Sequence, residues 1–325
     1  MRDTYLDSSK AVLIFLVVFG HFLERLIGWG NPLNHALLGT IYFVHMPAFI
    51  FISGLFYKDQ NWLKNIVFFI SLYVPFQILF PAFDALWTGT WQLNWNIFVR
   101  PYWILWYLMA MMAWTALTHI LIKTKYPVIF AIIMALGIGL SPWNNYQYSI
   151  GRIFTFFPFF MVGCCYGKRI VALIQGAKRS TLMAVFIIFG IVTLVALSKI
   201  NPFWLYGSLS YQQLQVSDVD GILIRLGCLL VSSLGILATF SLSRHMGQHG
   251  VQLGRNTLAV YLLHGFVVIL IARYCSLNVH ISIQILLCFI FSLLSCWLLQ
   301  QNIFDSLLRK LSLWLLKPTE KLWHK

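Results

Sequence analysis

The feature that most constrains this chain is a series of apolar runs, each about long enough to cross a bilayer as a helix. About 20 consecutive apolar residues span the hydrocarbon core as an α-helix. The chain of 325 residues is 60% hydrophobic and only 10% charged, which is typical of a polytopic membrane protein and excludes an ordinary soluble globule. We expect an all-α, integral membrane protein with a single membrane-embedded domain over residues 1–325. The predicted spans are 11–28, 36–56, 65–86, 102–122, 127–143, 153–171, 181–198, 222–242, 256–272 and 281–299.

The basic residues of the loops predict how these ten spans are oriented. With the N-terminus in the cytoplasm, 17 of the 23 lysine and arginine residues fall on the cytoplasmic side and six on the other. Such an excess of positive charge on the inner side is the usual pattern of membrane proteins. The even number of spans then predicts that both termini are cytoplasmic.

The net charge of +14 would suggest nucleic acid in a soluble protein. Here the basic residues lie between apolar spans, so we expect contacts with membrane lipids and no nucleic-acid partner. The C-terminal segment 305–325 is basic and amphipathic, which predicts a helix on the inner membrane surface. The six cysteines form no C-x-x-C pair, and we predict neither a disulfide framework nor a metal site.

The first span carries ionisable residues on one side of an otherwise apolar helix. Lys10 and His21 are eleven residues apart, which places them within roughly 20° of one face and about 16 Å apart along the axis. Asp7 and Glu24 fall on the same broad side. Ionisable groups at membrane depth are costly and therefore indicate a functional site. The alternative is a helix anchored at the headgroups by Lys10, with one histidine satisfied by a neighbouring helix.

A second histidine lies at matching depth in the next span, where His45 precedes Pro47 and the pair Ser53-Gly54. Pro47 frees backbone groups, and Ser53-Gly54 allows close helix approach. Histidine is suited to proton transfer near neutral pH.

The longest loops on the outer side, 84–101 and 199–221, are rich in tryptophan, tyrosine, asparagine and glutamine. These side chains fit either an interfacial aromatic belt or a carbohydrate site, in which aromatic faces stack on sugars and amides bind hydroxyls. Arg152 begins the sixth span on the same side. It either snorkels to the interface or contacts a sugar or diphosphate headgroup.

Several motifs together make the chain resemble integral-membrane acyltransferase family 3, in particular the branch of fucose 4-O-acetylase and related acetyltransferases. The first is Asp7, two residues, the basic Lys10, ten residues and His21; the second is the span ending HMPAFIFISGLF. The remaining matches are PYWILWYLMAM at 101–111, RIFTFFPFFMVG at 152–163 and LGRNTLAVYLLH at 253–264. The resemblance covers the whole chain, including the number of spans.

The resemblance implies acyl transfer, with acetyl-CoA as donor and a cell-surface or lipid-linked glycan hydroxyl as acceptor. It makes His21 the catalytic base and Lys10 its basic partner, although the family more often has arginine at that position, and lysine is only a point charge. We expect no bound cofactor, and a location in the bacterial inner membrane. Glu24 either orients the imidazole or pairs with Arg25, and Asp7 is a second candidate to orient it.

The remaining candidates are assigned by the side of the membrane on which we expect them. Lys58, Lys64 and Arg255 would join Lys10 in attracting the phosphates of CoA from the cytoplasm. The residues predicted to contact the acceptor or line the central path are His45, Arg152, Trp103, Tyr107, Asn256, Tyr261 and His264.

A different class of function uses the same residues. An exporter of glycans or lipid-linked sugars would also place histidines at the midplane and aromatic residues outside, and it would transport without CoA. Release of CoA from acetyl-CoA by the purified protein distinguishes the two.

Overall fold

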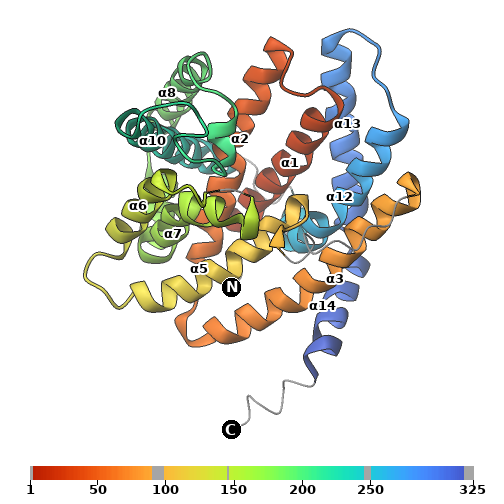
Figure 1. The fold of residues 1–325 in the computed structure, drawn as a ribbon, viewed down its shortest axis with the longest axis horizontal. Coiled ribbons are helices and arrows are strands. Elements are labelled where there is room, and N and C mark those ends of the chain that lie inside the picture. The colour runs from red at the N-terminus through yellow and green to blue at the C-terminus, as the bar shows by residue number, and fades with distance from the viewer. Residues whose placement is uncertain (1–2, 90–98, 145, 245–249, 318–325) are drawn as a thin grey trace.

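The computed structural model describes residues 3–89, 99–144, 146–244 and 250–317, and in these residues the regular structure is helical throughout (Figure 1). Nine of the described helices are long and apolar enough to cross a membrane, counting the short 3-10 turns that precede three of them: η1 (Asp59–Asn61), η2 (Trp103–Leu105) and η4 (Gln147–Ser149). They are α1 (Thr4–Leu26), α2 (Pro32–Leu55), α3 (Trp62–Thr88), α5 (Trp106–Leu121), α7 (Ile150–Gly176), α8 (Arg179–Leu197), α10 (Asp218–Ser243), α12 (Thr257–Tyr274) and α13 (Ile281–Leu299). The prediction of an all-α polytopic membrane protein is confirmed.

The fifth predicted span, 127–143, is shorter than expected. Helix α6 (Pro127–Gly137) continues as the 3-10 turn η3 (Ile138–Leu140) and ends there. Ser141 is extended because it precedes Pro142, whose ring disfavours a helical residue before it. The helix nevertheless connects the two ends of the bundle. It follows the end of α5, where His119 contacts Asp59, and at its other end Tyr211 donates a hydrogen bond to the Leu136 carbonyl.

Helix α1 is the centre around which the other helices are packed. It lies against α2, α10, α12 and α13, and against the short helix α11 (Val251–Arg255) (Figure 1). Ionisable side chains are costly against lipid, so a membrane helix that carries them is usually covered by other helices. Leu13, Ile14 and Val18 are accordingly fully buried. The polar residues of α1 are therefore held inside the protein and do not face lipid.

Two glycines let α2 and α7 approach closely. A Cβ atom on Gly54 would lie 2.0 Å from the Phe160 carbonyl oxygen, and one on Gly163 would lie 2.0 Å from that of Phe51. Small residues at such crossings allow the backbones of membrane helices to touch. The close approach predicted for Ser53-Gly54 is confirmed. It fixes α2, which carries His45, against α7, which carries Arg152.

The amphipathic C-terminal segment begins as α14 (Asn302–Leu316), three residues before the predicted boundary; residues 318–325 lie outside the described part. Its buried face contains Leu308 and Ser312, and the Ser312 hydroxyl is 2.6 Å from that of Ser71 on α3. Leu307 and Trp314 remain exposed on other faces, as an apolar surface for lipid would require.

The charge distribution leads to a topological prediction. A reporter that is active only outside the cytoplasm, fused after Lys325, should be silent, because an even number of crossings returns the chain to the side of its N-terminus. The same reporter inserted in the 199–221 loop should be active. Activity at Lys325 would contradict an even number of spans.

Candidate active site

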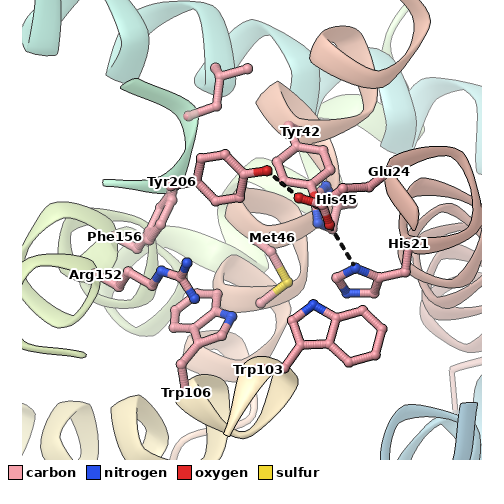
Figure 2. A pocket seen from close by; sticks show the side chains of 11 residues that line it. His21, Glu24, Tyr42, His45, Met46, Trp103, Trp106, Arg152, Phe156 and Tyr206 are labelled. Atoms are coloured by element: carbon pink, nitrogen blue, oxygen red, sulfur yellow. Dashed lines mark hydrogen bonds and ion pairs between the residues drawn. The ribbon is translucent and has the colours of Figure 1, made fainter. Parts of the chain in front are cut away.

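A cavity of about 90 Å³ lies among α1, α2, α5, α7 and the short helix α9 (Phe203–Tyr206) (Figure 2). Both histidines that were predicted at matching depth line it, together with three further candidates from the sequence. The lining residues are His21, Glu24, Tyr42, His45, Met46, Trp103, Trp106, Arg152, Phe156, Leu205 and Tyr206. Five predicted residues from four separate segments of the chain are thereby brought to one place.

His21 is paired with Glu24, which lies one helical turn further along α1. The Nδ1 atom of His21 is 3.5 Å from Oε2 of Glu24 (Figure 2), and residues three apart on a helix lie on the same side. The ring also meets Trp103 edge to face, with 4.7 Å between the ring centroids. A carboxylate at Nδ1 favours the tautomer whose proton is on that atom, which leaves Nε2 free to accept a proton.

Glu24 is itself held by two tyrosines from distant parts of the chain. The Tyr42 hydroxyl donates to Oε2 at 2.7 Å, and the Tyr206 hydroxyl donates to Oε1 (Figure 2). Tyr206 in turn accepts a hydrogen bond of 3.0 Å from the indole of Trp29. Hydrogen bonds to a carboxylate favour its charged form. Of the two alternatives for Glu24, the structure favours the orienter of His21, because Arg25 stacks instead on Trp103, 4.6 Å from its centroid.

Tyr206 is well suited to stay a donor in this network. It lies in the connection between α8 and α10, and burial together with the Glu24 carboxylate raises the pKa of its phenol. The hydroxyl therefore keeps its proton at physiological pH and continues to donate to Glu24.

We expect Tyr206→Phe to reduce activity by about 10-fold or more, because a hydrogen bond to a charged group contributes roughly 1.5–3 kcal/mol. The loss should be in turnover and not in folding, since the ring remains. Initial rates of acyl transfer, the reaction that the family resemblance implies, measure the loss, with Tyr126→Phe, whose side chain is exposed, as the control. Unchanged rates in Tyr206→Phe would show that the phenol hydroxyl does not support Glu24.

His45 and His264 flank the pair formed by His21 and Glu24. The Nδ1 atom of His45 is 2.7 Å from the Ile41 carbonyl oxygen, and Nδ1 of His264 is 3.0 Å from that of Val260. A carbonyl accepts only, so each Nδ1 donates and each Nε2 is left as an acceptor. His264 stacks on His21 with 5.4 Å between centroids and an angle of 20°. It does not line the cavity itself; it packs behind the predicted base.

Arg152 reaches the cavity from the first turn of α7. Its Nε atom donates to the Ser208 hydroxyl at 2.8 Å, and its guanidinium carbon lies 5.1 Å from the centroid of the Trp106 ring. Figure 2 shows the side chain extended into the cavity beside Trp106. Of the two readings, contact with a ligand fits this position better than snorkelling, because the guanidinium lies among aromatic side chains of the cavity.

The acidic and basic residues at the start of α1 form a separate cluster. The Nζ atom of Lys10 is 2.7 Å from Asp7 Oδ1, and Nε of Arg255 is 3.6 Å from Asp7 Oδ2. Asp7 precedes His21 by fourteen residues, about 21 Å along the helix. The prediction that Asp7 orients His21 is therefore wrong. Its buried carboxylate instead pairs with the two cations that were predicted to attract CoA.

Three other predicted lining residues have structural partners outside the cavity. Asn256 donates to the Gln300 carbonyl at 2.6 Å, the Tyr261 hydroxyl donates to the Ile104 carbonyl, and the Tyr107 hydroxyl is 2.6 Å from that of Ser53. Asn256 sits between α11 and α12 and joins them to the end of α13. The assignment of these residues to the cavity wall is corrected. Lys58 and Lys64 are exposed near the start of α3, where the donor prediction placed them.

Comparison with known proteins identifies the family to which the chain belongs. Residues 3–301 match the family model described as the acyltransferase domain of family 3. The chain belongs to acyltransferase family 3. A curated relative of this acyltransferase is the nodulation protein NolL of Sinorhizobium fredii (strain NBRC 101917 / NGR234), 24% identical over 298 residues, which cover 82% of this chain and 78% of NolL. No solved structure matches the acyltransferase.

The sequence motifs of the acyltransferase located the histidines but missed the residues that hold Glu24. Tyr42 precedes His45 by three residues and so shares its side of α2, which is the only local signal for it. Tyr206 lies in the aromatic outer loop that we considered for sugar binding, but its sequence position does not connect it with Glu24. Trp106 was also missed as a cavity residue, although it is the second tryptophan of the PYWILWYLMAM motif.

Proposed function

We propose that this membrane acyltransferase transfers an acetyl group from acetyl-CoA to a hydroxyl of a cell-surface or lipid-linked glycan in the bacterial inner membrane. The observation that carries the proposal is the pair of His21 and Glu24 in the cavity, with the carboxylate held by two phenols. Family membership supports acyl transfer. The pair of His21 and Glu24 also favours acyl transfer over export, because an exporter needs no base that is oriented by a carboxylate.

In this proposal, His21 acts as the general base. Its Nε2 takes the proton of the acceptor hydroxyl while the oxygen attacks the thioester carbonyl, and the imidazolium then returns the proton to the departing thiolate of CoA. Glu24 stabilises the imidazolium that forms between these events. A base within hydrogen-bond reach of the nucleophile contributes about 10²–10⁴-fold in rate.

The acceptor is proposed to enter through the outer connection, where Arg152, Trp106 and Tyr206 line the cavity. Aromatic faces bind the C–H faces of sugars, and the guanidinium and phenol groups bind oxygens. No residue of this set is specific for one sugar.

The donor is proposed to enter from the cytoplasm, near the cluster of Lys10, Asp7 and Arg255. Ile14 and Val17 lie on the same face of α1 between Lys10 and His21, and both are buried. A thioester arm that follows this face must therefore displace packed side chains. Since Lys10 and Arg255 both pair with Asp7, the phosphates of CoA would have to compete with that carboxylate.

We expect donor and acceptor to be used from opposite sides of the membrane. In sealed right-side-out vesicles, radiolabelled acetyl-CoA enclosed inside should label an external glycan acceptor. The same acetyl-CoA added only outside should not, because Lys10 and Arg255, which are proposed to attract the phosphates of CoA, lie at the opposite end of α1 from His21. Labelling from external donor alone would contradict this arrangement. Export of glycan without release of CoA would contradict acyl transfer itself.

A further inference from the structure

Arg152 lines the cavity, Arg100 shares an aromatic ring with it, and Arg25 lies on the ring of Trp103, which also lines the cavity. The guanidinium carbon of Arg25 is 4.6 Å from the centroid of Trp103, and that of Arg100 is 4.6 Å from the centroid of Tyr146. Arg152 lies 5.6 Å from the same Tyr146 ring. Trp103 lines the cavity, and its ring also contacts His21. Only this one side chain therefore separates Arg25 from the proposed base.

Of the carboxylates in the described residues, that of Glu24 shares the cavity with Arg152 and attracts its guanidinium electrostatically. Among the described residues, neither Arg25, Arg100 nor Arg152 forms an ion pair with an aspartate or glutamate. The one carboxylate of the cavity, Glu24, is already occupied by His21 and two phenols. Two guanidinium groups that share one ring repel each other, so an anion between them would be stabilised.

The backbone adds to the positive potential at this place. Arg152 is the third residue of α7, and the N-terminal end of a helix carries partial positive charge on its free N–H groups. Ser149, which precedes the helix, makes no capping hydrogen bond with its side chain. The positive end of a helix of 27 residues therefore meets the guanidinium groups.

We propose that the acceptor is an anionic glycan, and that Arg152 and Arg100, with Arg25 beside them, bind its negatively charged group while the hydroxyl to be acylated reaches His21. The inference rests on the proposed function and adds the class of acceptor. The shared chemistry is an oxyanion group attached to a sugar. It is supplied either by the diphosphate of a lipid-linked precursor or by the carboxylate of an acidic sugar, and both match the planar fork of arginine.

The experiment measures binding directly, without acyl transfer. Purified protein in detergent is unfolded thermally at constant ionic strength with increasing concentrations of inorganic pyrophosphate, glucuronate or glucose. A ligand that binds only the folded protein raises its Tm, by an amount that grows with ln(1 + L/Kd), where L is the free ligand concentration. We expect a rise with pyrophosphate or with glucuronate that follows this logarithmic dependence, and none with neutral glucose. A preference for pyrophosphate identifies the lipid-linked diphosphate as the source of the anion, and a preference for glucuronate identifies an acidic sugar.

Variants locate the site. Arg152→Gln and Arg100→Gln should each weaken the apparent affinity at least tenfold, and Arg152→Lys should weaken it less, because it keeps the charge but loses the fork. The matched control is Arg273→Gln, an exposed arginine that donates to the Trp87 carbonyl at 2.8 Å and does not line the cavity. Since Arg100 is also exposed, its replacement tests the site even if Arg152→Gln does not fold.

Two results would overturn the inference: no rise in Tm with either anion, or an equal rise in the Arg152→Gln, Arg100→Gln and Arg273→Gln proteins. Anion binding in a protein that transfers no acetyl group would count against the proposed function alone. Acetyl transfer to a neutral glycan, without anion binding, would count against this inference alone.

Discussion

Replacing His21 by alanine is expected to abolish acyl transfer, and replacing it by glutamine is expected to do no better. Glutamine keeps a hydrogen-bonding group of similar reach but cannot take a proton, so both variants lose the contribution of about 10²–10⁴-fold that a general base makes. Steady-state release of CoA from acetyl-CoA with a glycan acceptor measures the loss.

The control for His21 is His280→Gln, because His280 is an exposed histidine at the start of α13 and lies outside the cavity. Each protein is also checked for its thermal unfolding in detergent, since His21 packs against Trp103 and His264. A folded His21→Gln protein with wild-type rates would remove His21 as the base.

The second large effect is expected from Glu24→Gln. The amide has nearly the same shape as the carboxylate but carries no charge, so it can no longer stabilise the imidazolium of His21. In enzymes where a carboxylate orients a catalytic histidine, the corresponding amide lowers turnover by up to about 10⁴-fold, and we expect at least about 100-fold here. The loss should fall on kcat and leave KM for the donor nearly unchanged.

The matched control for Glu24 is Asp218→Asn, an exposed acid in the first turn of α10. The variant Tyr42→Phe provides an intermediate step, since it removes one of the two phenols on Glu24 and leaves the carboxylate in place. A Glu24→Gln protein that keeps wild-type kcat would show that the carboxylate has only a structural role, and the proposed chemistry of His21 would then have to proceed without it.

The sequence by itself determined the helices and the spacing along each of them. Apolar runs of sufficient length are helical because a membrane leaves the backbone no other partner for its N–H and C=O groups. The pairing of His21 with Glu24 follows from the same periodicity, since three residues along a helix return to the same side. The length of α6 was predicted less well, because Pro142 ends the helix before the apolar run does.

Tertiary structure alone decided which helices became neighbours, and with them the rest of the site. Tyr42 and Tyr206 are 18 and 182 residues from Glu24, and no periodicity connects residues on different helices. Asp7 is a different case, because the fourteen helical residues between it and His21 already exclude it as the orienter. Only the tertiary structure gives its partner Arg255, which lies on α11; this helix packs against α1 at Gly254, where a Cβ atom would be 1.7 Å from the Asp7 carbonyl oxygen. Helix contacts depend on the shape and volume of many side chains together, and these are defined only when the helices are packed.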